Sequence, residues 1–109
     1  MSKKNQFHAL RDVFIQAEAH ARTKGNERHA LTPDQPFVKQ PICELTRQLG
    51  LGFPLGQAVK KVLESQQLER YPARAKAELL GAINYIAAAV IVLGEQAIAK
   101  SKEKHGEGR

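Results

Sequence analysis

Residues 77–99, "AELLGAINYIAAAVIVLGEQAIA", constrain the fold of this chain more than any other stretch does. Sixteen consecutive positions from Leu79 to Gly94 carry no charged side chain, and Asn84 is the one strongly polar residue among them. Alanine and leucine favour helix because they lose little conformational freedom there. A helix that is apolar on every side is normally a buried one. The segment therefore predicts a long internal helix, from about residue 73 to residue 100.

Three further helices are predicted upstream. Residues 4–23 carry apolar side chains at helical spacing with charged residues between them, which is typical of an amphipathic helix. Pro41 opens a short helix that ends at Gly50, and Pro54 opens another that ends before "QQLERYPAR", because proline fits the first turn of a helix. No segment shows the alternating pattern of a strand. The predicted class is all-α: a small bundle of three to four helices with a long buried C-terminal helix.

The helix that begins at Pro54 is expected to turn an aliphatic stripe toward the core and a charged side toward solvent. The expected inward residues are Leu55, Ala58, Val59, Val62 and Leu63, and the expected outward ones are Gln57, Lys60, Lys61 and Glu64.

A loop at residues 25–40 is long for so small a domain, which indicates a function or an arm that packs on a partner. Lysines beside an apolar helix surface can neutralise phosphate as point charges. Lys60 and Lys61, with Arg28 or His29 from this loop, are therefore the predicted ligand-binding residues.

The apolar helix also predicts an oligomer, because three other helices, one of them short, cover only part of its circumference. Small residues along it allow a second helix to approach closely, and a symmetric contact between two copies is the simplest cover. Asn84 is expected inside that contact, where a lone buried polar group sets the register. The predicted interface residues are Ala82, Tyr85, Ala89 and Val92.

A membrane span is not expected, since sixteen uncharged positions fall short of the eighteen or so that a span needs. The net charge of +6 is concentrated at the ends: residues 1–4 and 100–109 each contribute +2. Residues 1–100 are predicted to form one helical domain and residues 101–109 a disordered basic tail. The single cysteine, Cys43, cannot form an intramolecular disulfide, which fits a cytoplasmic protein.

Motifs that would identify a reaction are missing. The four histidines form no close pair at metal-ligand spacing, so no metal site is predicted, and no cofactor can be named. The segment "CELTRQLGLGFPLGQAVKKVLESQQLER" has the outline of a helix-turn-helix, but Gly56 stands where such motifs usually place an apolar residue. DNA is therefore a less favoured partner, and whether the protein is an enzyme stays open.

Two segments carry a family resemblance: "FPLGQAVKKVLE", residues 53–64, and "AELLGAINYIAAAVI", residues 77–91. They resemble the small phage nucleotide kinase family and its SaV-like relatives, in which a Phe-x-Leu-Gly-x-Ala-x-Lys helix precedes an acidic-Leu-x-x-Ala-x-x-Tyr helix. This resemblance implies a helical, MazG-like fold and a role in nucleotide metabolism. The matching positions are Phe53, Leu55, Gly56, Ala58 and Lys60, then Glu78, Leu79, Ala82 and Tyr85.

Three functional hypotheses remain open. The working hypothesis is a small helical oligomer of phage or mobile-element type that binds nucleotides or acts in nucleotide metabolism. The alternatives are a non-enzymatic helical protein-interaction module and a helix-turn-helix DNA-binding regulator. The expected partners are accordingly a second copy of the chain, a nucleotide and, less favoured, DNA.

Overall fold

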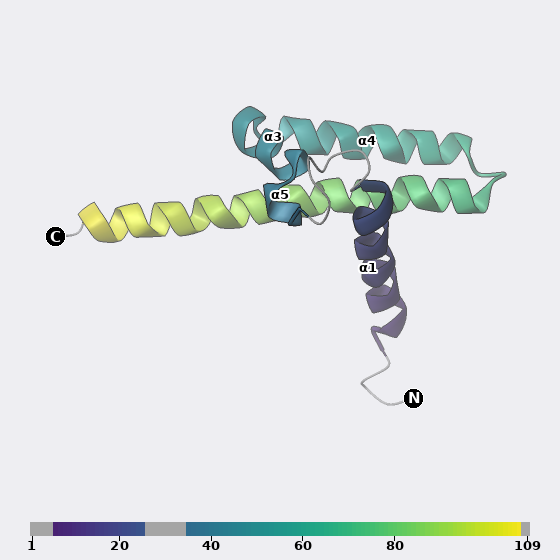
Figure 1. Cartoon of the computed structure of the whole chain (residues 1–109), viewed down its shortest axis with the longest axis horizontal. Coiled ribbons are helices and arrows are strands. Elements are labelled where there is room, and N and C mark those ends of the chain that lie inside the picture. The colour runs from purple at the N-terminus through teal and green to yellow at the C-terminus, as the bar shows by residue number, and fades with distance from the viewer. Residues whose placement is uncertain (1–5, 26–34, 108–109) are drawn as a thin grey trace.

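The computed structural model of the protein describes residues 6–25 and 35–107, and over these ranges it contains helices and turns but no strand. The all-α class is confirmed. Figure 1 shows a long C-terminal helix with the other helices packed along part of its length. In chain order the elements are α1 (His8–His20), the π-helical turn η2 (Ala21–Gly25), the 3-10 turn η3 (Phe37–Lys39), α3 (Pro41–Leu49), α4 (Gly52–Gln67) and α5 (Pro72–Glu107).

The α4 and α5 helices form an antiparallel hairpin, and small side chains allow the close approach of the two helices (Figure 1). Ala58 on α4 and Ala82 on α5 are both buried. The ring of Phe53 meets the ring of Tyr85 edge to face, with their centroids 6.1 Å apart. The buried cluster is completed by Ile42, Cys43 and Ala88. The core of the protein therefore lies where α3 and the first half of α4 meet the middle of α5.

The α3 helix has the boundaries that the sequence predicts. Pro41 stands at its start, and Gly50 ends it with a φ of 88°, in the left-handed region that favours glycine. Thr46 is fully buried, and its hydroxyl donates to the carbonyl of Ile42 at 2.7 Å. The one polar side chain on the buried side of this helix therefore has its partner within the same helix.

One arginine fastens α3 to α5. The guanidinium of Arg47 donates from Nε and Nη2 to the two carboxyl oxygens of Glu95, each at 2.8 Å. It also donates to the carboxylate of Glu44 at 2.9 Å and to the carbonyl of Val38 at 2.8 Å. The hydrogen bonds from Arg47 hold the pKa of the Glu95 carboxyl below its ordinary value. A paired, planar contact of this kind fixes orientation as well as distance.

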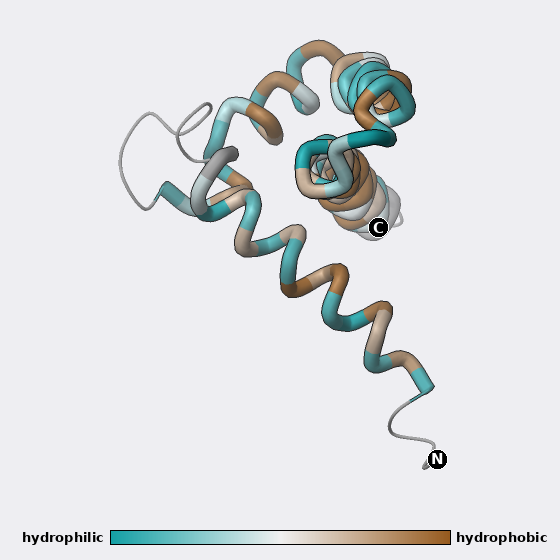
Figure 2. The backbone as a smooth tube through the Cα atoms, turned by 90° about the vertical axis from the view of Figure 1, so that its right-hand side faces the viewer, coloured by the Kyte–Doolittle hydropathy of each residue, from teal (hydrophilic) through white to brown (hydrophobic). Residues whose placement is uncertain are grey.

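The α1 helix is attached to the rest of the chain at its C-terminal end. Ala17 is its one buried residue, and the side-chain amide of Asn84 on α5 donates to the Ala17 carbonyl at 3.0 Å. Figure 2 shows the N-terminal part of α1 running away from the hairpin. Asn84 therefore serves a contact within one chain, whereas the sequence pattern predicts it in a contact between two copies.

The orientation predicted for α4 was wrong. The large residues expected inward, Leu55, Val59, Val62 and Leu63, are exposed, and of that set only Ala58 is buried. Lys61, expected outward, lies against α5 with its side chain 14% exposed. The hairpin closes through Pro54, Ala58 and Ser65, the buried residues of α4, which lie on a different side of the helix from its large aliphatic ones. The helix also begins at Gly52, so that Pro54 lies buried in its first turn.

The last helix is longer and less covered than expected. It continues to Glu107, so residues 101–107, predicted as part of a tail, belong to its final turns. It is not buried on every side, because Leu79, Ile86, Val90 and Leu93 are exposed. The other helices of the chain therefore cover part of the circumference of α5 and leave a strip of it open.

The sole thiol provides a probe of this core. Cys43 has no exposed surface, and burial raises the pKa of its thiol. Because a buried thiol reacts only when the structure opens, we expect a disulfide-exchange reagent to label the native protein at least about a hundredfold more slowly than the urea-unfolded chain. Labelling of native protein at the rate of a free thiol would contradict the placement of Cys43.

The contact between Arg47 and Glu95 should depend on pH. The folded-state pKa of Glu95 is below its unfolded value of about 4.3, so the stabilisation is present above that value and is lost as the pH falls through the folded-state pKa. We expect Glu95→Gln to lower the free energy of unfolding at neutral pH and to have no effect in acid. Urea unfolding across this range measures the difference. Glu64→Gln is the matched control, because its partner Lys60 lies 3.9 Å away on the surface.

Candidate functional site

The two lysines predicted to share a ligand site are separated by the helix on which they lie. Lys60 is an exposed residue, 3.9 Å from Glu64 one turn further along α4. Lys61 points toward α5, where its Nζ atom lies 3.4 Å from Oε2 of Glu78. Arg28 and His29 lie outside the described residues. Of the two lysines, only Lys61 lines a cavity in the described part of the chain.

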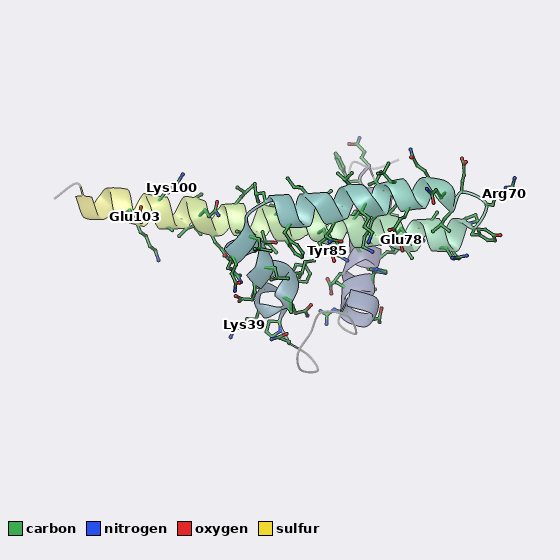
Figure 3. The ribbon with its side chains drawn as sticks, turned by 90° about the horizontal axis from the view of Figure 1, so that it is seen from above. Lys39, Arg70, Glu78, Tyr85, Lys100 and Glu103 are labelled. Atoms are coloured by element: carbon green, nitrogen blue, oxygen red, sulfur yellow. The ribbon has the colours of Figure 1, made fainter. Side chains whose placement is uncertain are left out.

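This cavity, which we call the inner cavity, has a volume of about 420 Å³ and draws on five segments of the chain. Figure 3 labels two of its residues, Glu78 and Tyr85, on the part of α5 that lies beside α4. Its lining combines the polar residues His20, Gln40, Lys61, Arg74, Glu78 and Asn84 with Ala21, Phe37, Ile42, Leu68, Ala77, Gly81 and Tyr85. Polar groups from helices far apart in the sequence thus converge on an aromatic and aliphatic floor.

Lys61 lies at the wall of the inner cavity because Gly81 makes room for it. A methyl group at Gly81 would meet Cδ of Lys61 at 3.0 Å and Cε at 3.1 Å, which is closer than such contacts normally come. The aliphatic part of Lys61 therefore lies across the backbone of α5, and its ammonium group reaches Glu78. Arg74, on the same wall, stacks over the ring of Tyr71 at 5.3 Å.

A second feature is an apolar surface on the hairpin, which we call the outer face. It comprises Leu55, Val59 and Val62 of α4 and Leu79, Ile86, Val90 and Leu93 of α5, all of them exposed. Each of these residues lies close in sequence to one that faces the partner helix, as Val59 follows Ala58 and Ile86 follows Tyr85. The residue that follows an inward-facing one points about 100° further round its helix. Because the two helices run in opposite directions, these following residues lie on the same side of the pair. The two rows therefore form one surface.

The row on α5 has the spacing of a coiled-coil seam. Leu79, Ile83, Ile86, Val90 and Leu93 follow one another at intervals of four, three, four and three residues. Ile83 is half-buried, and the other four side chains are exposed. One position of the repeat holds the branched residues Ile83 and Val90, and the other holds leucine at two of its three places, with Ile86 between them. Branched residues at the first position and leucine at the second favour two-stranded pairing. Less than three full heptads are present, so such a seam needs support from neighbouring helices.

The α1 helix borders a second groove next to this seam. The groove has a volume of about 840 Å³, and its apolar lining includes Phe14 of α1 with Ile83, Ile86 and Val90 of α5. Beyond the groove, α1 carries further exposed apolar side chains at helical spacing. Figure 2 shows this part of α1 diverging from the hairpin.

The four residues predicted as an oligomer interface are placed inside one chain. Ala82, Tyr85, Ala89 and Val92 are 3%, 7%, 4% and 1% exposed. A second copy could touch little of them, and the residues available for contact are their exposed neighbours on the outer face. The spacing of Leu79 through Leu93 is visible in the sequence and could have indicated these residues.

By length and composition alone, one helix of the described part of the chain could cross a membrane. It spans Pro72–Glu103, and an apolar window within it has a mean hydropathy of 1.8, with 33% of that window buried. Among the same residues, no group of three or more histidine, cysteine or carboxylate side chains is arranged to hold a metal ion.

Comparison with protein-family models, with curated proteins and with solved structures gives no match for this chain. The resemblance of residues 53–91 to the small phage nucleotide kinase family therefore stays a hypothesis based on those residues.

The contact between Gly81 and Lys61 leads to a stability prediction. Replacing a glycine inside a helix with alanine gains about 0.5–1 kcal/mol where space is open. We expect Gly56→Ala, which meets nothing within 4 Å, to show that gain, and Gly81→Ala to show less of it or a loss. Urea unfolding measures both. In a Lys61→Ala background the two substitutions should become equivalent, and a persistent difference would show that Lys61 is not the obstacle.

Proposed function

We propose that this protein is a self-associating helical module whose outer face pairs with the outer face of a second copy. The observation that carries this proposal is the continuous apolar surface on α4 and α5, with the α1 groove beside it. Exposed side chains on it include Val59, at 58%, and Val90, at 62%. Monomeric soluble proteins seldom leave so large an apolar patch open to water.

The size of the exposed surface is in line with such pairing. The chain exposes 8337 Å², about 2,300 Å² more than the roughly 6,000 Å² expected of a folded monomer of this mass. Its radius of gyration is 16.7 Å, against about 13 Å for a compact domain of this length. A standard interface buries about 800 Å² on each partner. The chain is therefore more extended than a compact monomer of this mass, as a protomer that packs against a second copy would be.

A second copy fits this surface better than lipid does. The apolar row occupies one side of α5, while Glu78, Asn84 and Glu95 on its other sides make polar contacts within the chain. A membrane span would carry those groups into hydrocarbon, where each costs several kcal/mol unless fully paired. The outer face has no such group among its seven side chains.

The same surface argues for protein contact over DNA contact. A helix that reads a DNA groove presents polar side chains to base edges and phosphates, whereas the exposed row of α4 is Leu55, Val59 and Val62. Of the two lysines on this helix, Lys61 is turned inward. The nucleotide hypothesis depends on the resemblance of residues 53–91, and its structural counterpart is the inner cavity.

We expect the wild-type protein to sediment at micromolar concentration with twice the 12.1 kDa mass of the chain. Val90→Glu should sediment as a folded monomer, because a charge at an exposed position is harmless in one chain but costs several kcal/mol when buried unpaired between two. The matched control is Leu49→Glu, which places the same charge at a residue 66% exposed on α3, outside the outer face.

A wild-type monomer, or equal dissociation by Val90→Glu and Leu49→Glu, would overturn the proposal. The wild-type protein is also mixed with neutral phosphatidylcholine vesicles and centrifuged. Sedimentation with the vesicles that is lost in Val90→Glu, together with a monomer in their absence, would assign the outer face to a membrane instead.

A further inference from the structure

The inner cavity shares no lining residue with the outer face, although Ala21, Phe37, Gln40 and Asn84 line both the cavity and the groove beside α1. Its lining comes from parts of the chain that are far apart in the sequence. His20 comes from the end of α1 and Gln40 from the position just before α3, while Lys61 comes from α4 and Asn84 from α5. Its volume of about 420 Å³ falls within the range of roughly 300–1,000 Å³ that small-molecule sites occupy. The cavity is therefore large enough for a small organic molecule.

A lysine is a costly choice at the position of Lys61. Its side chain is 14% exposed and lies within the contact between two helices, where an apolar residue of similar length would fill the same space without desolvating a charge. Gly81 leaves the space in which the lysine lies, because a methyl group in place of its hydrogen would come within 3.0 Å of Cδ. Two positions on two helices thus combine to bring one ammonium group to the cavity wall.

The pair that Lys61 makes leaves capacity for another acceptor. Its distance to Glu78 is 3.4 Å, longer than the roughly 2.7–2.9 Å of a strong charge-assisted hydrogen bond, and an ammonium group has three protons to donate. With Arg74 also at the wall, the lining holds two cationic side chains and one carboxylate. An anion in the cavity would balance this charge.

The remainder of the lining determines which uncharged group can accompany the anionic group of a ligand. Phe37, Ile42, Leu68 and Tyr85 present aromatic and aliphatic surface next to the charged wall. The amides of Gln40 and Asn84 donate to the backbone, at 2.8 Å to Gln35 and at 3.0 Å to Ala17. These two amides fix the cavity wall, which leaves the cations Lys61 and Arg74 to recognise the charge. Lys61 is the less exposed of the two and is therefore the principal contact.

We propose that the inner cavity binds a small organic anion, a carboxylate or phosphate monoester on a body about the size of an aromatic ring, and that Lys61 is its principal charge contact. This site is independent of self-association through the outer face.

The test uses the full-length, isotope-labelled protein at constant ionic strength. Phenyl phosphate and benzoate are titrated while backbone amide resonances are recorded, with inorganic phosphate and phenol as probes of the two halves of the ligand. We expect saturable shifts at residues around the cavity with at least one of the two aromatic anions, and weaker binding of each half alone. Phenyl phosphate and benzoate together separate a phosphate site from a carboxylate site.

Lys61→Met keeps the aliphatic stem and removes the charge, so we expect it to weaken binding about tenfold, the loss of one charged contact. Lys60→Met removes the same charge from the adjacent, exposed position and should leave binding unchanged. Gly81→Ala, which displaces the lysine without changing the charge, should also weaken it. Repeating the titration with Leu93→Glu, a change on the outer face at a residue that lines neither the cavity nor the groove, should give the same affinity.

Two results would overturn the proposal. The absence of saturable shifts at the cavity with both aromatic anions would show that it takes no such ligand. Equal weakening by Lys61→Met and Lys60→Met would show that the anions respond only to the net charge of the protein. If Lys61→Met fails to fold, the comparison of Gly81→Ala with Gly56→Ala decides the matter in the same way.

Discussion

The rest of this structure depends on how much of one apolar helix a short chain can cover. The α5 helix has contacts along three directions, with α4 beside it, α3 near its middle and the end of α1 across it. The other side remains open as the row Leu79, Ile86, Val90 and Leu93. Since burial of apolar surface is the main favourable term in folding and association alike, an uncovered row of this length is the strongest indication of a partner that the molecule carries.

Small residues decide which side of each helix faces the other. The hairpin closes at Ala58 and Ala82, where the two backbones can approach closely. Next to Ala82, Gly81 leaves space for the aliphatic part of the Lys61 side chain. Large aliphatic residues are thereby pushed to the outside of the pair. One packing choice thus produces both features of interest, the apolar outer face and the charged group at the inner cavity.

Local patterns in the sequence were sufficient for the elements and insufficient for their orientation. Pro41 marks the start of α3 because proline suits the first position of a helix, and Gly50 marks its end because glycine suits the position just after the last turn. On α4, however, two stripes have helical spacing, one through Ala58 and one through Val59, and hydropathy prefers the larger residues. The surface of α5 decides which of the two stripes faces inward. The periodicity of α4 holds no information about that surface, because α5 lies elsewhere in the sequence.

The candidate sites show the same division. The sequence predicts Lys60 and Lys61 together as ligand-binding residues, whereas the closing of the hairpin turns Lys61 inward and leaves Lys60 exposed. Arg47 and Glu95, 48 residues apart, give no local sign of pairing. The residues predicted as an interface are buried within the chain, one position away from exposed ones on the same helix, because no pattern in the sequence says which side α3 and α4 occupy.

The attachment of α1 has a consequence for the order in which the chain folds. The hairpin contact of Lys61 with Glu78 joins residues 17 apart, whereas the hydrogen bond between Asn84 and Ala17 spans 67. Closing the longer loop costs more chain entropy, and a single hydrogen bond with one buried alanine returns little free energy until the hairpin exists. The hairpin is thus expected to form first and α1 to dock last. Until α1 docks, both the outer face and the side of α5 that α1 covers are exposed to water. The newly made chain is therefore most prone to associate with other apolar surfaces before α1 docks.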